Sequence, residues 1–98
     1  MALMHTEQLD ELFRSMLLLE NVEECYQYFE DICTVKEVLA LGQRLEVAKM
    51  LNEGKSYQET IARTGSSSTT ISRVKRSLDY GAGGYKLILA RMEETEKE

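Results

Sequence analysis

One stretch, residues 55–80, limits the fold of this 98-residue chain more than any other feature. Two segments with helical apolar spacing meet there at a single glycine, Gly65. Glycine adopts the left-handed backbone conformation at no steric cost, so Gly65 predicts a sharp turn between two helices. In the first segment Tyr57 and Ile61 are expected to face inward, although Ile61 is bulkier than the residue usual at its position. In the second segment the apolar residues at i, i+3 and i+7 share one face: Ile71, Val74 and Leu78. The stretch therefore predicts a helix-turn-helix unit.

The rest of the chain indicates further helices. It contains no proline, and its apolar residues recur every three or four positions, as in amphipathic helices. These patterns predict an all-α fold of about six short helices in a single domain, residues 1–98. The expected helices span residues 5–19, 22–33, 35–52, 56–64, 67–80 and 85–92. Glycines at 81–84 predict a flexible break, and residues 93–98 predict an acidic, solvated end.

Short polar side chains mark where several of these helices begin. Thr6 and Asn21 are expected to cap the first two of them, because the side-chain oxygen of a capping residue accepts a backbone N–H. Thr34 is followed three residues later by Glu37, which is the spacing of a capping box. These local signals predict the starts of the first three helices.

The helix expected at residues 35–52 is apolar on more than one side. A helix of this kind needs packing partners on two sides. In so short a chain the second partner is expected to be another subunit, so the sequence predicts a homodimer. The alternative, in which the chain wraps this helix by itself, stays open.

Charge is divided unevenly along the chain. The net charge of −5 argues against a protein that coats nucleic acid at any position. Residues 1–31 carry eight acids and one base, whereas residues 55–80 carry five bases and two acids. The local charge of +3 (five minus two) favours double-stranded DNA as the partner of the helix-turn-helix. The acidic part would orient the encounter.

Several classes of protein are excluded by the sequence. No apolar run is long enough to span a membrane, and the amino terminus lacks a secretion signal, so a cytoplasmic protein without membrane partners is expected. Cys25 and Cys33 are expected to be reduced and buried, and with His5 the only histidine they predict no metal site. No nucleophile or carboxylate pair has the spacing that catalysis requires, so we predict no catalytic residue and no enzyme.

The outward face of the helix after the turn carries groups that suit DNA. Ser66 or Ser67 is expected to cap this helix, whose first backbone amides can bind a phosphate. Lys75 and Arg76 can neutralise phosphates, Arg76 can bind guanine, and short hydroxyls can touch a base edge. The predicted DNA-binding residues are Gln58, Ser66, Ser67, Ser68, Thr69, Ser72, Arg73, Lys75 and Arg76. The alternative is a polar loop followed by a solvated helical face.

Four segments resemble the tryptophan-repressor family: VLALGQRL at 38–45, LNEG at 51–54, TG at 64–65 and TISR at 70–73. The run ISRVKRSL at 71–78 resembles the YerC/YecD branch of that family. The resemblance covers roughly residues 9–92. It implies an intertwined all-α homodimer whose helix-turn-helix units bind DNA.

The resemblance also implies a site for a small-molecule corepressor. The matching positions are Thr34, Arg44, Arg73 and Ser77. In the family, the residue matching Arg44 packs on the indole ring of tryptophan and the residue matching Arg73 holds its carboxylate. Val74, however, stands where the family has a glycine, and its branched side chain would occupy space that the indole needs. We therefore expect no cofactor and no control by tryptophan, while another small corepressor stays open.

These features lead to one expected function and one alternative. We expect a sequence-specific DNA-binding transcriptional regulator, a repressor, that reads the major groove as a homodimer through residues 66–76. The alternative is a protein-interaction module that retains the fold without specific DNA binding.

Overall fold

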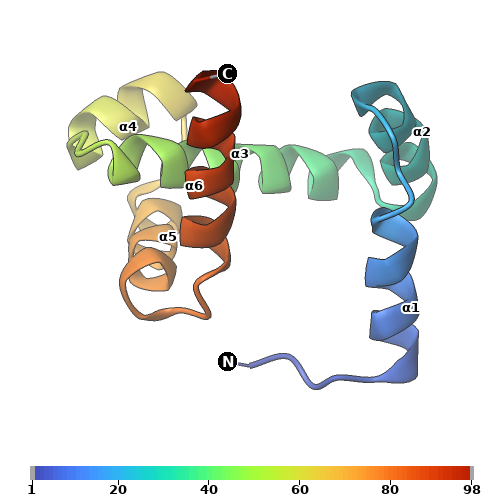
Figure 1. Cartoon of the computed structure of the whole chain (residues 1–98). Coiled ribbons are helices and arrows are strands. Elements are labelled where there is room, and N and C mark those ends of the chain that lie inside the picture. Colours follow the sequence, from blue (N-terminus) through green and yellow to red (C-terminus); the bar gives the residue numbers. More distant parts are fainter. Residues whose placement is uncertain (1, 98) are drawn as a thin grey trace. The chain divides into compact units, whose positions relative to one another are not determined.

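The computed structural model describes residues 2–97, and within them it contains six α-helices and no strand (Figure 1). The helices are α1 (Glu7–Met16), α2 (Val22–Ile32), α3 (Val35–Asn52), α4 (Tyr57–Thr64), α5 (Ser68–Tyr80) and α6 (Gly84–Lys97). The predicted all-α class and the number of helices are confirmed. The chain divides into an amino-terminal unit, Met1–Val38, and a carboxy-terminal unit, Leu39–Glu98, and each is described by itself. The single domain stays a prediction.

Side-chain caps fix the starts of the first three helices, as the sequence predicts. The side chains of Thr6 and Asn21 accept the backbone N–H groups three residues further on, at 3.1 and 2.9 Å. In the capping box, Thr34 N donates to Glu37 Oε1 at 2.8 Å, and Glu37 N donates to Thr34 Oγ1 at 3.2 Å. The backbone N–H of Thr34, and then its hydroxyl, lower the pKa of the Glu37 carboxyl. The stabilisation by this box is therefore present at neutral pH and is lost as the pH falls through the lowered pKa.

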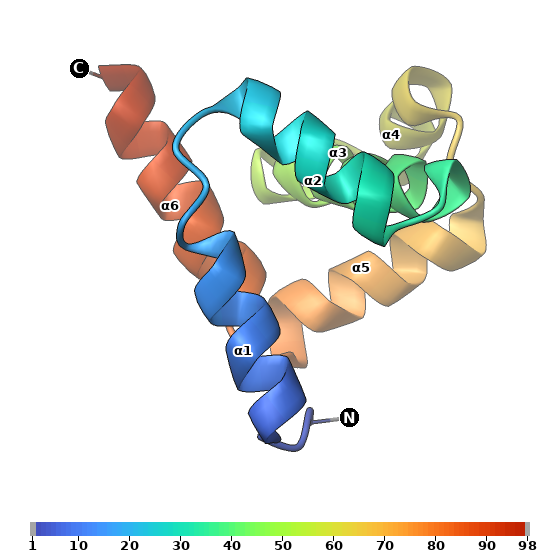
Figure 2. The same cartoon turned by 90° about the vertical axis from the view of Figure 1, so that its right-hand side faces the viewer.

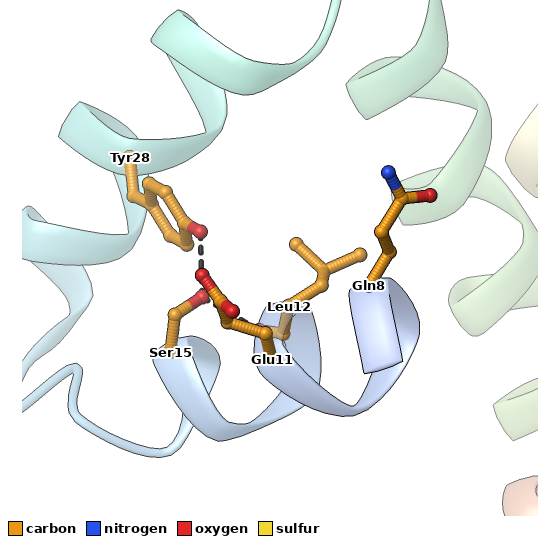
Figure 3. A pocket seen from close by; sticks show the side chains of 5 residues that line it. All are labelled: Gln8, Glu11, Leu12, Ser15 and Tyr28. Carbon is orange, nitrogen blue, oxygen red and sulfur yellow. Dashed lines mark hydrogen bonds between the residues drawn. The ribbon is translucent and has the colours of Figure 1, made fainter. Parts of the chain in front are cut away.

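In the amino-terminal unit, α1 and α2 are joined by a hydrogen bond between Ser15 and Tyr28 (Figure 3). The two oxygens are 2.6 Å apart, and Ser15 Oγ also donates to the carbonyl of Leu12 at 2.6 Å. Because a hydroxyl has one proton to donate, Tyr28 is the donor of the pair. A hollow of about 280 Å³ opens beside this bond, lined by Gln8, Glu11, Leu12, Ser15 and Tyr28.

The core of the carboxy-terminal unit is built from α3, α5 and α6. Figure 1 shows the short loop that joins α5 to α6, and Figure 2 shows the two helices from another side. The inward face of α5 is confirmed, with Ile71, Val74 and Leu78 at 0%, 3% and 6% exposure. These side chains form one buried cluster with residues of the two neighbouring helices, namely Val47, Ala48, Leu51 and Leu89. Burial of this apolar surface holds α5 against the rest of the unit.

Within α4 the inward residue is Thr60, and the prediction for Tyr57 and Ile61 is wrong. Thr60 is fully buried, whereas Tyr57 and Ile61 are each 40% exposed. A threonine can occupy this apolar position because its Oγ1 donates to the backbone carbonyl of Ser56 at 2.8 Å. A buried hydroxyl that is bonded to a carbonyl one turn earlier carries little desolvation cost.

Three other expectations differ from the structure. Helix α1 ends at Met16 and not at residue 19, because the next residues tighten into i→i+3 hydrogen bonds. Helix α6 begins at Gly84 and continues through the acidic residues to Lys97, so the break is shorter and the acidic end is largely helical. Cys25 is exposed and Cys33 is half-buried, whereas both were expected to be buried. No helix within residues 2–97 is long and apolar enough to cross a membrane.

Candidate nucleic-acid interface

Helices α4 and α5 are joined by a turn of three residues, 65–67, at the glycine where the sequence predicts a sharp turn. The Ser56 side chain caps α4 by accepting the N–H of Glu59 at 3.1 Å. Gly65 ends α4 in the left-handed conformation, with φ 72° and ψ 7°, as expected from its position. Of the two serines considered as the cap of α5, Ser67 takes that role, and its Oγ accepts the N–H of Thr70 at 3.2 Å. The helix-turn-helix is thus present with its turn and both caps.

The outer face of α5 is a polar surface with a shallow depression of about 340 Å³, which we call the reading face. Five of the predicted DNA-binding residues line it: Ser68, Thr69, Ser72, Arg73 and Arg76. All five side chains are exposed. They lie opposite the buried stripe that holds α5 in the core, so the helix presents them on a fixed support. The structure therefore brings together three hydroxyls, two guanidinium groups and the start of a helix.

The basic side chains of α5 differ in whether an acidic group lies beside them. Among residues 2–97, neither Arg73 nor Arg76 has an acidic group within 4.0 Å. Lys75, by contrast, is half-buried, and its Nζ lies 3.4 Å from Oδ1 of Asp79, one turn further along α5. Part of the Lys75 charge is therefore neutralised, so the two arginines are the principal cations of the face. Asp79 was absent from the predicted site, although its i+4 spacing from Lys75 is visible in the sequence.

The remaining predicted DNA-binding residues lie outside the depression. Gln58, in the first turn of α4, and Ser67, the cap of α5, are exposed. Ser66 is 3% exposed, and its Oγ has no hydrogen-bond partner among the described residues. Its side chain is therefore not offered to a ligand at this surface. A buried hydroxyl without a partner is unusual, and the sequence carries no signal for it.

The residues expected to bind a corepressor are divided between the two units, and the corepressor site stays a prediction. Arg73 lines the reading face, whereas Arg44 and Ser77 are exposed and do not line it. Thr34 belongs to the amino-terminal unit, where its hydroxyl is engaged in the capping box. In the part of the chain that the structure describes, no three His, Cys, Asp or Glu residues are grouped as metal ligands.

Comparison with known proteins identifies the family. A family model described as Trp repressor protein matches residues 7–93. The uncharacterized protein YerC of Bacillus subtilis (strain 168) is 52% identical over 92 residues, which cover 94% of this chain and 88% of YerC. A crystal structure of a Staphylococcus aureus protein, proposed to be a Trp repressor, has a TM-score of 0.88 at 53% identity, covering 91% of this chain and 89% of that one. A TrpR-like protein from Eubacterium eligens ATCC 27750 has a TM-score of 0.87 at 46% identity, covering 90% and 91%. This chain belongs to the Trp repressor family, a family of DNA-binding regulators.

Proposed function

We propose that this chain is a sequence-specific transcriptional regulator, acting as a repressor, that reads the DNA major groove as a homodimer. The observation that carries the proposal is the reading face, where three hydroxyls share one exposed helical surface with two arginines that have no acidic partner among residues 2–97. The buried stripe on the other side of α5 gives this surface a rigid support. A helix of this kind after a tight turn is the element that enters the major groove in helix-turn-helix proteins.

Each group of the reading face suits a different part of the duplex. The backbone N–H groups at the start of α5 are suited to a phosphate, which the helix dipole also favours. Arg73 and Arg76 can neutralise phosphates, and the planar guanidinium of Arg76 can bind O6 and N7 of guanine. Thr69 and Ser72 are short enough to approach a base edge or a thymine methyl group. Phosphate contacts would set the position of α5, and base contacts would give the sequence preference.

Exposed apolar side chains support the homodimer. Helices α1 and α2 contain no buried residue, and the first half of α3 leaves Val35 and Leu39 at 75% and 67% exposure. Only the second half of α3 enters the core of the carboxy-terminal unit. The large apolar residues left exposed before residue 42 include Phe13, Leu17, Leu18, Val22, Tyr26, Ile32 and Leu41. A soluble protein rarely leaves so much apolar surface in water, and a second copy of the chain would cover it.

A dimer would also provide the number of base contacts that site-specific DNA recognition needs. A single α5 offers too few base contacts for site-specific affinity. Two copies related by a two-fold axis would place two reading faces about one helical turn apart, roughly 34 Å, and would read a palindrome. The proposed dimer thus supplies both cover for the apolar surface and the spacing of the half-sites.

We further propose that tryptophan does not control this protein. Val74 is 3% exposed, and its side chain is part of the buried cluster with Leu78 and Leu89. A glycine at this position would leave space beside α5, and the valine side chain takes that space instead. Displacing it to admit an indole ring would strain a packed core.

The chain is therefore expected to show no change in melting temperature when tryptophan is added. A ligand present at 100 times its Kd stabilises the folded state by about 2.7 kcal/mol, which shifts the Tm of a domain this size by about 10 °C or more. Differential scanning calorimetry with millimolar tryptophan, and with the other amino acids in parallel, measures the shift. A rise of several degrees with tryptophan would contradict the role assigned to Val74.

DNA binding itself is tested by titrating the chain onto a duplex of random sequence at several salt concentrations. If Arg73 and Arg76 of two subunits each neutralise one phosphate, log K falls with log[salt] at a slope of about −4, because each phosphate contributes about −0.9. Fluorescence anisotropy of a labelled duplex gives the constants. Absence of binding at about 50 mM salt, where phosphate contacts are strong, would refute the proposal.

A further inference from the structure

One side chain of α3, that of Gln43, contacts the turn between α4 and α5. Gln43 is half-buried, and its Nε2 donates to the backbone carbonyl of Thr64 at 3.2 Å. The same peptide unit is held on its other side, because Gly65 N donates to the carbonyl of Ile61 at 2.9 Å. Both polar atoms of the Thr64–Gly65 peptide are therefore bonded, one from α3 and one from α4. This fixes the plane of the peptide at the point where the chain leaves α4.

The side chain of Thr64 extends this hold towards α5. Its Oγ1 donates to the carbonyl of Thr60 at 2.7 Å and accepts the N–H of Ser66 at 3.1 Å. The next residue, Ser67, is the cap from which α5 begins. An unbroken series of hydrogen bonds thus leads from Gln43 through Thr64 to the first residues of the turn.

We propose that Gln43 is a positioning residue for DNA recognition and sets the direction of α5 relative to α3. The inference rests on the proposed function. It concerns a residue of α3 that lies outside the reading face and affects it only through the orientation of α5. Helix α3 also carries Val35 and Leu39, whose exposed side chains support the dimer. Gln43 therefore connects α3, whose first half is proposed to contribute to the dimer interface, with the turn from which the reading face begins.

The two kinds of DNA contact should respond differently to the loss of this bond. Base contacts require the side chains of the reading face to lie within hydrogen-bond reach of particular atoms. Phosphate attraction acts over a longer range and tolerates a small rotation of α5. Loss of the Gln43 bond should therefore reduce the ratio of specific to non-specific binding. A loss of folded protein would instead reduce both affinities by the same factor.

The test compares Gln43→Met, which keeps the length of the side chain but removes the donor, with Gln27→Met at an exposed position of α2. A third variant, Gln43→Lys, restores a donor within reach of the Thr64 carbonyl. The native chain is first used to select a preferred duplex from a random pool. For each variant we then measure the affinity for this selected duplex and for a random duplex, and take the ratio of the first affinity to the second as the measure of specificity. Amide hydrogen exchange at Gly65 and Ser66 is measured on the same samples. The added lysine charge raises the affinity for both duplexes, so its effect cancels in the ratio.

For Gln43→Met we expect the ratio to fall roughly tenfold, which corresponds to one hydrogen bond in each of two subunits, with exchange at Gly65 and Ser66 faster. Gln27→Met should change neither quantity, and Gln43→Lys should recover most of the ratio. An unchanged ratio in Gln43→Met would overturn the role of Gln43 and leave the proposed function intact. If the native chain binds no duplex, the proposed function fails, and with it the role in recognition. The exchange rates then still show whether Gln43 holds the turn.

Discussion

Replacing Arg73 and Arg76 together by alanine is expected to weaken binding to a selected duplex about a thousandfold. Each arginine contact with a phosphate or a guanine contributes about 1–3 kcal/mol, and the proposed dimer makes four of them. A sum of about 4 kcal/mol, at the low end of that range, already corresponds to a factor near a thousand. Both side chains are exposed and stand apart from the buried cluster, so the unfolding temperature should hardly change. Fluorescence anisotropy and thermal unfolding of the double variant measure the two effects.

The matched control for this variant is Arg14→Ala with Arg91→Ala, which removes the same charge from exposed positions on α1 and α6. If the control weakens binding as much as the reading-face variant does, net charge and not the reading face governs binding. The double variant also separates the proposed regulator from a protein-interaction module. In such a module, Arg73 and Arg76 would be dispensable for binding to a protein partner, and the native chain would show no preference among duplexes.

Replacing Val35 and Leu39 together by glutamine is expected to convert the dimer into monomers. Burying a side chain of this size contributes about 1.5–3 kcal/mol, and a dimer would bury four of them. The variant would therefore lose about 6–12 kcal/mol, most of the free energy of a micromolar to nanomolar dimer. Sedimentation velocity at micromolar concentration should show a dimer for the native chain and a monomer for the variant. Because folding and assembly are linked in such dimers, the unfolding temperature should fall as well.

Lys36→Gln provides the control for the dimer, since it introduces the same residue at an exposed polar position between the two on α3. This variant should sediment as the native chain does. A native chain that sediments as a monomer would show that α3 is covered by its own chain, as the alternative to a dimer requires. A double variant that stays dimeric would place the interface on other residues.

The starts of the helices could be predicted because their signals are local. Thr6, Asn21 and the Thr34–Glu37 pair each bond to a backbone group three residues away, so the sequence contains both partners. The same holds for Gly65, whose left-handed conformation is a property of one residue and its turn. The buried face of α5 could be predicted as well, since a period of 3.6 residues needs no knowledge of the partner helix.

The errors arose where a residue's surroundings depend on a distant or unusual partner. Thr60 is buried because its own helix satisfies its hydroxyl, and hydropathy alone favours its neighbour Ile61. The bond between Gln43 and Thr64 joins residues 21 positions apart, and no local pattern marks it. Cys25 faces solvent in this chain, because the amino-terminal helices have no buried core of their own. If a second copy covers that unit, as we propose, the sequence of one chain does not describe the contacts that bury these residues.

Selection of binding sites from a pool of random duplexes tests most directly whether α5 reads DNA as part of a two-fold dimer. The native chain is incubated with the pool at about 100 mM salt, and the bound duplexes are amplified and sequenced over several rounds. We predict enrichment of a palindromic sequence whose half-sites are centred about 10 base pairs apart, one turn of the DNA helix. The same selection with the Arg73→Ala, Arg76→Ala variant should enrich nothing. A native chain that enriches no sequence over the starting pool, or one without two-fold symmetry, would contradict sequence-specific reading by a homodimer.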